Sequence, residues 1–320
     1  MLALLNRTAY RLHDIIASGW TDIGQADKSR ATFVDGGNSS IIKTPAAELQ
    51  RIRTAAVATE NNKLAEAVQK EGYLLVKLEL DDAGKIRCKA ELKESTLELG
   101  SDDLSGIAYE TAGTGENTSA LVKFCETARR LAEMNAAQNA VMRKRSKFIV
   151  LDGTLEAFNA AEMRAIRELM AAAADKNIII GSVAKTCSLL TDAGKPLLEA
   201  VEGVSGKNEG YIIVAEGLSE RHNATVAVAR LNSSANYIFR IEAANKAELL
   251  QLIPALKEQS NDLAFPGYPY GLIMADRFAR ISEQDAELTK AKIRATAAAD
   301  VKALLKDEKA LDANSVLDSM

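Results

Sequence analysis

The chain has 320 residues, of which 47% are hydrophobic, enough to bury a sizeable core in one large domain or two small ones. Its 40 Lys and Arg residues nearly balance 44 Asp and Glu residues, and the net charge of -4 provides no global basic field to attract nucleic acid or an anionic membrane. The two histidines, His13 and His222, exclude a multi-histidine zinc or copper site and an H-E-x-x-H metalloprotease motif.

The first part of the chain is predicted to be a helix followed by a β-meander. Apolar residues at helical spacing predict an amphipathic helix at residues 1–18. Short apolar runs separated by Gly, Asn and Asp then predict antiparallel strands. We expect hairpins between the first two strands and, through residues 82–84, between the last two. These strands are expected at residues 31–37, 39–43, 51–59, 73–80 and 85–92.

The second part alternates helices and strands. Residues 118–140 keep one face apolar and predict a long helix, capped by Thr118 or Ser119. Continuous apolar runs predict buried strands. Strands are expected at residues 147–154, 177–185, 211–216, 225–231 and 236–242, and helices at 160–174, 246–257, 270–279 and 283–307. The predicted fold class is α/β, a mixed sheet flanked by helices with N- and C-terminal helical extensions.

No long Pro-, Gly- or Ser-rich linker and no repeat divides the chain. We therefore predict a single domain over residues 1–320, with the helix at 1–18 and a C-terminal helix and tail at 283–320. Without a signal-peptide core or membrane span, the protein is expected to be soluble, cytoplasmic and not membrane-bound. Cysteines without a C-x-x-C pair fit a reducing compartment, and we interpret them as core thiols. They are Cys88, Cys125 and Cys187.

Two apolar β runs end in Asp-Gly, at Asp35 and Asp152. An aspartate at the carboxyl end of a buried strand lies at the rim of the sheet, where α/β proteins place active sites. Asp-Gly is also a common tight-turn signal, and each aspartate taken alone fits a structural turn better than a catalytic role. Two carboxylates converging in one cleft repel each other unless a divalent cation lies between them, and oxygen ligands suit magnesium or manganese. Metal-assisted phosphodiester hydrolysis is one chemistry that such a site supports.

The LDGTL segment has a rival interpretation. Haloacid-dehalogenase-type phosphatases carry D-x-D-G-T-L, in which the first aspartate is the nucleophile. This chain has Val150 at that position, and an aliphatic side chain cannot act as a nucleophile. The covalent chemistry of those phosphatases is therefore not expected.

Charged residues around the long predicted helix have both structural and functional interpretations. Glu126 and Glu133 are two turns apart and share a face away from the apolar stripe, where glutamates are usually solvated. One of them supplies a third carboxylate if that face looks into the cleft. The basic run at residues 143–147 either contacts a phosphate backbone or forms a solvated turn.

An aromatic and Pro-rich cluster surrounds the short helix predicted at residues 270–279. It contains Phe265, Tyr268 and Tyr270, although only 5% of the residues in the chain are aromatic. A Pro-stiffened loop that packs these rings into the core accounts for it. The functional alternative places Tyr268 and Asp276 at the mouth of the cleft, where the tyrosine stacks on a base or contacts a phosphate.

Taken together, these segments resemble the NurA nuclease family, the DNA-end-processing partners of the HerA translocase. The resemblance lies in FVDGGNSS, FIVLDGTL and GYPYGLIMADRFA, in the family's order. A fourth segment, IIIGSVAKT, resembles a family-typical strand that ends in lysine, here Lys185. It implies an RNase H-like fold and Mn²⁺- or Mg²⁺-dependent nuclease or exonuclease cleavage in DNA end resection and repair. It also implies a homodimer that docks on a hexameric HerA-type ATPase and acts on DNA.

The resemblance also implies roles for individual residues. Asp35 and Asp152 would be metal ligands, and Glu133 would be the acidic ligand on the helix, with Glu126 as the substitute. The cations would lower the pKa of a bound water and stabilise charge on the leaving oxygen, with no covalent intermediate.

Further site residues follow from the other two matching segments. Tyr268 would be the family's tyrosine in the Y-P segment, and Lys185 would contact the scissile phosphate. Where the family often has a histidine, eight residues after the tyrosine, this chain has Asp276. This change either adds a ligand or removes a proton-transfer group. Two alternatives stay open: a non-catalytic docking subunit of a DNA-processing complex, or another RNase H-like phosphohydrolase.

Overall fold

The computed structural model describes residues 19–80, 85–107, 110–111, 117–217, 220–296 and 301–306. The predicted helix at 1–18, the turn at 82–84 and the tail from 307 onward lie outside these ranges. In the part of the chain that is described, every helix is too short or too polar to span a bilayer.

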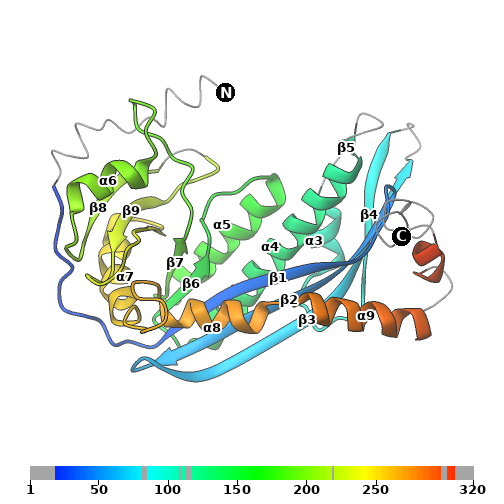
Figure 1. The fold of residues 1–320 in the computed structure, drawn as a ribbon, viewed down its shortest axis with the longest axis horizontal. Helices are drawn as coiled ribbons and strands as arrows, with labels where there is room; N and C mark the ends of the chain where they lie inside the picture. The colour runs from blue at the N-terminus through cyan, green and yellow to red at the C-terminus, as the bar shows by residue number, and fades with distance from the viewer. Residues whose placement is uncertain are drawn as a thin grey trace, which may run out of the picture. The chain divides into compact units, whose positions relative to one another are not determined.

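The strands form a mixed sheet, as predicted, in which they pair in the order β5-β4-β3-β2-β1-β6-β7-β10-β9-β8 (Figure 1). The pairs β1–β6 and β6–β7 are parallel, and β10 is antiparallel to both of its neighbours. The described strands are β1 (Ala31–Lys43), β2 (Ala47–Glu60), β3 (Lys63–Leu80), β4 (Ile86–Lys93), β5 (Glu110–Thr111), β6 (Phe148–Asp152), β7 (Ile179–Ala184), β8 (Gly210–Glu216), β9 (Thr225–Arg230) and β10 (Phe239–Ala243).

Several helices begin and end close to their predicted positions. Two short ones, α3 and α6, were not predicted from the sequence. The described helices are α3 (Ser101–Ser105), α4 (Asn117–Arg143), α5 (Ala160–Ala174), α6 (Leu197–Ser205), α7 (Lys246–Glu258), α8 (Tyr270–Ala279) and α9 (Glu283–Thr296).

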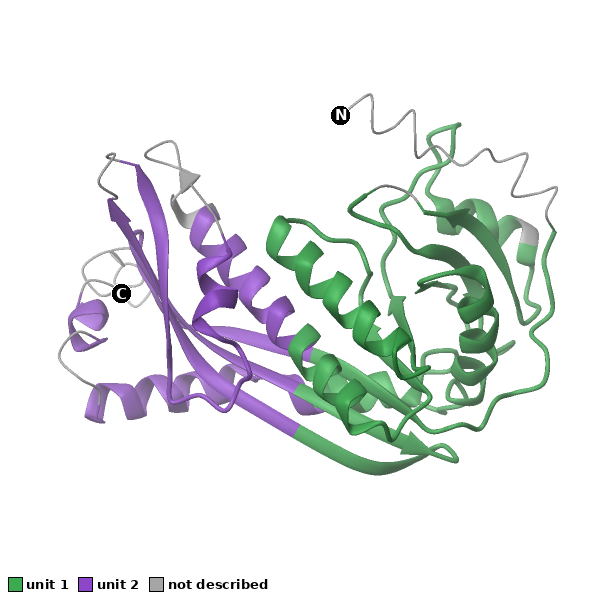
Figure 2. Cartoon of the chain, turned by 180° about the vertical axis from the view of Figure 1, so that it is seen from behind, with its two compact units in different colours: residues 1–35, 55–68, 134–277 green, residues 36–54, 69–133, 278–320 purple. Residues whose placement is uncertain are grey.

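The chain divides into two compact units (Figure 2). The chain passes between them inside β1, β2, β3, α4 and α8, so no separate linker joins them. The single-domain organisation stays a prediction. Unit 1 comprises Met1–Asp35, Ala55–Val68 and Met134–Arg277, and unit 2 comprises Gly36–Thr54, Gln69–Glu133 and Phe278–Met320.

The two faces of the sheet in unit 1 pack against different helices. On one face, Val34 of β1 and Leu151 of β6 form a buried cluster with Val141 of α4 and Leu169 of α5. Because successive side chains of a strand point to opposite faces, the neighbours of Val34 and Leu151 face the other way. The aspartates that end these two runs, Asp35 and Asp152, therefore lie on the face that does not pack against α4 and α5.

Helices α7 and α8 pack closely on that other face of unit 1. A Cβ atom on Gly181 of β7 would collide with the side chain of Leu252 in α7. A Cβ atom on Gly271 of α8 would collide with the ring of Phe33 in β1. The missing side chains thus let both helices approach the sheet.

This packing predicts the effect of a substitution in α8. Alanine normally stabilises a helix relative to glycine by about 1 kcal/mol. Gly271→Ala is nevertheless expected to destabilise unit 1 by about 1–3 kcal/mol, because the methyl group meets the Phe33 ring. Chemical denaturation measures the difference, with Gly203→Ala in α6 as control, since that Cβ has no atom within 4 Å. Stabilisation by both alanines would contradict the close packing.

Strand β1 runs continuously from Ala31 to Lys43, so the predicted hairpin between residues 31–35 and 39–43 is wrong. Gly36 and Gly37 do not have positive φ angles, and no turn requires them. A Cβ on Gly36 would lie 2.5 Å from Oε1 of Glu133, and one on Gly37 would collide with the carbonyl oxygen of Ala279. These glycines make room for neighbouring elements, which overrides the local turn signal. Gly153 has a positive φ of +98 and lies at the bend that follows Asp152.

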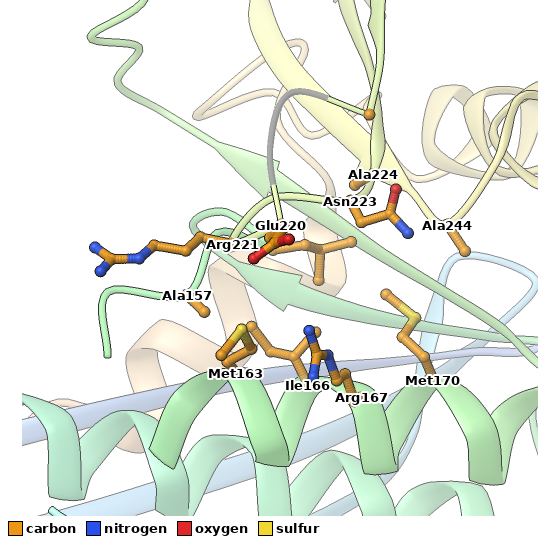
Figure 3. Close-up of a pocket in the computed structure, with 12 residues that line it drawn as sticks. Ala157, Met163, Ile166, Arg167, Met170, Glu220, Arg221, Asn223, Ala224 and Ala244 are labelled. Atoms are coloured by element: carbon orange, nitrogen blue, oxygen red, sulfur yellow. The ribbon is translucent and has the colours of Figure 1, made fainter. Parts of the chain in front are cut away.

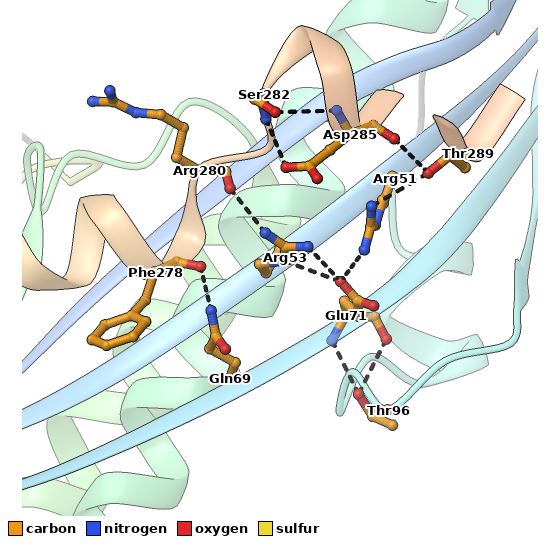
Figure 4. A network of polar contacts seen from close by, with 10 residues as sticks. All are labelled: Arg51, Arg53, Gln69, Glu71, Thr96, Phe278, Arg280, Ser282, Asp285 and Thr289. Carbon is orange, nitrogen blue, oxygen red and sulfur yellow. Dashed lines mark hydrogen bonds and ion pairs between the residues drawn. The ribbon is translucent and has the colours of Figure 1, made fainter. Parts of the chain in front are cut away.

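In unit 2, polar contacts hold the last turn of α8 and the segment after it against β2 and β3 (Figure 4). The Gln69 side chain donates to the carbonyl oxygen of Phe278 at 2.6 Å, and Arg53 donates to that of Arg280 at 2.9 Å. Glu71 accepts from Arg53 and from Arg51. Burial raises the pKa of Glu71, but these hydrogen bonds outweigh it and the pKa is lowered.

Strand β3 is longer than the sequence predicted. Residues 63–72, which the sequence did not predict as strand, belong to it.

Candidate active site

Asp35 and Asp152 lie on adjacent parallel strands at the carboxyl end of the sheet in unit 1. The register pairs Val34 of β1 with Leu151 of β6, and each aspartate is the next residue along its strand. Neighbouring strands are about 4.8 Å apart, and residues in register point to the same face. Both aspartates are half-buried. The structure therefore brings together these two residues singled out by the sequence.

Two hydrogen-bond donors from different elements orient the carboxylate of Asp152. Lys185, which directly follows β7, donates from Nζ to Oδ2 at 2.8 Å. Tyr268, which precedes α8, donates its hydroxyl to Oδ1 at 3.0 Å. The Tyr268 side chain is buried, whereas the Lys185 side chain is 42% exposed. Asp152 is thus fixed from the core side by Tyr268 and from the solvent side by Lys185.

A third carboxylate, that of Asp276, acts electrostatically on Lys185 together with Asp152 and Asp35. Burial lowers the pKa of Lys185, but the negative charges of Asp152, Asp276 and Asp35 outweigh it, and the pKa is raised. Burial and the charge of Asp152 raise the pKa of Tyr268. Lys185 is therefore an ammonium ion and Tyr268 a protonated donor at neutral pH. The negative charges of Asp35, Asp152 and Asp276, all singled out from the sequence, therefore act on both Lys185 and Tyr268.

The ring of Tyr268 is enclosed by other side chains. The Lys185 ammonium lies 4.9 Å from the ring centroid, and the rings of Phe239 and Phe265 lie 5.2 and 5.6 Å from it. Only 1% of Tyr268 is exposed. A ring enclosed in this way cannot stack on a base, so only the hydroxyl of Tyr268 is available to the site.

Glu133 belongs to unit 2, where it is buried in α4. It forms an ion pair with Arg129 one turn earlier, and its carboxylate lies against Gly36, the residue that follows Asp35 in β1. Arg129 also donates to the carbonyl oxygen of Gly36 at 2.9 Å. Glu126 is exposed. The role of Glu133 as third ligand stays a prediction, and the i,i+4 spacing of Arg129 was an available signal for its ion pair.

Most of the basic run before β6 forms ion pairs within unit 1. Arg143 and Arg145 lie 3.1 and 3.3 Å from the carboxylate of Glu66, and Lys147 lies 2.8 Å from that of Asp27. Paired cations contribute less to binding a phosphate backbone than unpaired ones. This favours the structural interpretation of the run.

The three cysteines differ in burial. Cys125 is fully buried in α4, as predicted, and burial raises its pKa. Cys88 and Cys187 are only partly buried, and burial raises the pKa of Cys88 to about 11. High pKa values keep the thiols protonated and unreactive.

A buried ionic cluster beneath the loop after Asp152 was not predicted from the sequence. Glu242 of β10 is fully buried, accepts the backbone N–H of Leu155 at 2.7 Å and lies 3.0 Å from Nε2 of His222. It also forms an ion pair with buried Arg240. The cluster therefore fixes a loop residue three positions after Asp152. Two charged residues in an otherwise apolar strand were the signal that could have identified it.

A cavity of about 700 Å³ lies elsewhere in unit 1 (Figure 3). Helix α5 contributes Met163, Ile166 and Met170 to its wall, and Arg221 and Asn223 come from the segment before β9. None of the sequence-predicted site residues lines it. The candidate chemistry thus belongs to the strand ends and not to this cavity.

The donor chemistry at the strand ends fits a hard divalent cation. Asp35 and Asp152 offer oxygen ligands, which suit Mg²⁺ and Mn²⁺, and the ammonium of Lys185 already pairs with Asp152 there. Within the described ranges, no three His, Cys, Asp or Glu side chains lie close enough together to hold an ion. A bound ion would therefore be held by the aspartate pair together with water or substrate oxygens, or with a carboxylate brought closer.

Comparison with known proteins agrees with these observations. The NurA domain model matches residues 196–281, which include Tyr268 and Asp276. No curated protein matches the chain. Among solved structures, the NurA nuclease from Sulfolobus solfataricus has a TM-score of 0.53 at 13% identity, over 92% of each chain. A NurA structure bound to dAMP and manganese has a TM-score of 0.55 at 11% identity, over 91% of this chain and 93% of that one.

At these identities, the structural likeness shows the fold alone. It confirms the α/β fold that the resemblance in sequence implied. The family-model match adds a NurA domain in the part of the chain that carries Tyr268. The chain thus shares the fold of the NurA structures and carries, at residues 196–281, a segment similar to the NurA domain.

Proposed function

We propose that this protein is a divalent-metal-dependent nuclease that hydrolyses phosphodiester bonds at DNA ends. The observation that carries the proposal is the pair of carboxylates, Asp35 and Asp152, at the ends of adjacent parallel strands. Oxygen donors at this edge of an α/β sheet are suited to metal-assisted hydrolysis. The NurA structures with manganese, one of them also with dAMP, support the same chemistry.

In this proposal, Asp35 and Asp152 hold Mn²⁺ or Mg²⁺, and Glu133 is the third ligand. When bound, such an ion lowers the pKa of a coordinated water and stabilises charge on the leaving oxygen. Tyr268 holds the carboxylate of Asp152 in one orientation through its hydroxyl. Glu133 requires release from its ion pair with Arg129 to act as a ligand.

Lys185 and Asp276 complete the proposed site. The Lys185 side chain is 42% exposed, so its ammonium, which pairs with Asp152, would also be accessible to the scissile phosphate. Asp276 adds negative charge, which favours binding of a cation over a free anionic strand. In this arrangement cleavage, as distinct from stacking of a base, depends on the metal.

We further propose exonuclease action in DNA end resection and repair, by a homodimer that works with a HerA-type hexameric ATPase. The net charge of -4 supports a partner that delivers the DNA, because the chain lacks the net positive charge that would otherwise supply affinity. Binding of free DNA is then expected to be weak and strongly dependent on salt.

The experiment that tests the proposal is digestion of end-labelled linear single- and double-stranded DNA with Mn²⁺, Mg²⁺ or EDTA. The wild type is expected to degrade DNA with either metal and not with EDTA, and Asp35→Asn is expected to be inactive. If wild type and variant are equally inert, including with a HerA-type ATPase present, the chain is a docking subunit and the nuclease proposal is wrong.

A further inference from the structure

Two aromatic rings near the candidate site are exposed to solvent. Tyr237, just before β10, is 59% exposed, and Phe265, between α7 and α8, is 37% exposed. Their centroids lie 6.0 Å apart and their planes are inclined by only 22°, so the rings are stacked. Exposed large apolar side chains that gather in one place usually mark a binding surface.

This pair is connected to the carboxylates through Tyr268. The ring of Phe265 meets that of Tyr268 edge-on at 5.6 Å, and the Tyr268 hydroxyl donates to Asp152 at 3.0 Å. All four residues belong to unit 1. A line of aromatic rings thus leads from the surface, at Tyr237, to the proposed metal ligand.

The loops that carry the two rings are held in place by polar contacts. Asn232, in the first loop, donates from its side chain to Oδ1 of Asn261 at 3.0 Å, in the second loop. In that second loop, the carboxylate of Asp262 accepts the backbone N–H of Phe265 at 3.1 Å. The rings are therefore positioned before any ligand arrives, which reduces the entropy cost of binding.

We propose that Tyr237 and Phe265 form a stacking platform for an unpaired base of the DNA end, next to the phosphodiester that is cleaved. The inference rests on the proposed nuclease function and names its substrate class. Every base has a π-face, so an aromatic platform binds single strands with little regard to sequence. The ring of Tyr268 cannot stack on a base, because other side chains enclose it.

In this proposal, the aromatic platform recognises the base of a nucleotide and a charged group recognises its phosphate. The base stacks on Tyr237 and Phe265, and the phosphate is met by Lys185, whose ammonium lies over the Tyr268 ring. A duplex end must open before its last base can stack in this way. The substrate is therefore a single-stranded or frayed DNA end, and a fully paired blunt end is a poorer one.

The test is a double-mutant cycle between the protein and the DNA. Binding of a single-stranded oligonucleotide is measured in EDTA, which prevents cleavage, alongside the same oligonucleotide with an abasic terminal nucleotide. The wild type is expected to bind the abasic strand about tenfold more weakly. A Tyr237→Ala/Phe265→Ala variant is expected to bind the intact strand about tenfold more weakly than the wild type, with no further loss for the abasic strand.

Two further variants control for indirect effects. Phe265→Leu keeps an apolar side chain without an aromatic face and is expected to lose part of the discrimination while the protein stays folded. Phe158→Ala removes another exposed aromatic side chain of unit 1, 60% exposed, and is expected to discriminate like the wild type. Thermal unfolding by circular dichroism verifies that each variant is folded.

The outcomes separate this inference from the nuclease proposal. Equal binding of intact and abasic strands by the wild type, or full discrimination by the double alanine variant, overturns the platform. Metal-dependent cleavage by the same protein leaves the nuclease proposal standing in either case. A wild type that neither cleaves nor binds DNA overturns both.

Discussion

Asp152→Asn is expected to lower the rate of Mn²⁺-dependent DNA cleavage by more than about 100-fold. Losing a residue that only supports a metal ligand typically costs about 10–100-fold, and Asp152 is proposed to be a ligand itself. The amide keeps the size of the side chain and can still accept from Tyr268, but it loses the ion pair with Lys185. Single-turnover digestion of end-labelled DNA at saturating Mn²⁺ measures the effect, and calorimetric titration should show weaker Mn²⁺ binding.

A matched control distinguishes the loss of a ligand from a general change in charge. Asp175, at the C-terminus of α5, is an exposed aspartate of the same unit. Asp175→Asn makes the same chemical change and is expected to leave cleavage and Mn²⁺ binding unaltered. If Asp152→Asn cleaves DNA at the wild-type rate, Asp152 is a structural turn residue and the metal site has been assigned wrongly.

Glu242→Ala is expected to lower the free energy of unfolding by about 3–5 kcal/mol, the usual cost of removing one partner from a buried ion pair. The variant leaves the Arg240 charge buried without its partner and deprives His222 and the Leu155 amide of their acceptor. Urea denaturation measures the change. Glu216→Ala, which removes an exposed glutamate from β8, is expected to change stability by less than about 0.5 kcal/mol. Similar losses in both variants would contradict the structural role of the cluster.

The same cluster makes stability depend on pH. Burial raises the pKa of Glu242, but hydrogen bonds and charges from its partners outweigh it, and the pKa lies below the ordinary value of 4.5. A lowered folded-state pKa stabilises the protein above the unfolded-state value, and this contribution is lost as the pH falls below 4.5 through the folded-state pKa. Denaturation of the wild type across this range should therefore show a steeper loss than that of Glu242→Gln. Parallel profiles would show that Glu242 is not ionised in the folded protein.

Much of the helical structure follows from local patterns. Helices α5 and α8 begin and end at the residues that the sequence predicted. In α5, Asn159 caps the first turn by accepting the backbone N–H of Glu162. Such signals act between residues three or four positions apart, and they are legible without the rest of the chain.

Local patterns also identified the pair of aspartates, because a buried apolar run that ends in a carboxylate predicts a position at the edge of a sheet. The sequence alone determined these elements, the oxygen-rich character of the site and its likeness to the NurA family. Asp35 and Asp152 needed only the parallel register of β1 and β6 to become neighbours.

Only the tertiary structure decided the rest, because the decisive contacts join residues far apart in the chain. The local sequence around Gly36 predicts a turn, but Gly36 lies within a continuous strand. A glycine is found there because the side chain of Glu133 packs against it and leaves no room for a Cβ atom. No periodic pattern in the sequence indicates that Tyr237 stacks on Phe265, because the two rings belong to separate loops. The sequence specifies local geometry through nearby residues, whereas pairing of distant side chains depends on how the whole chain packs.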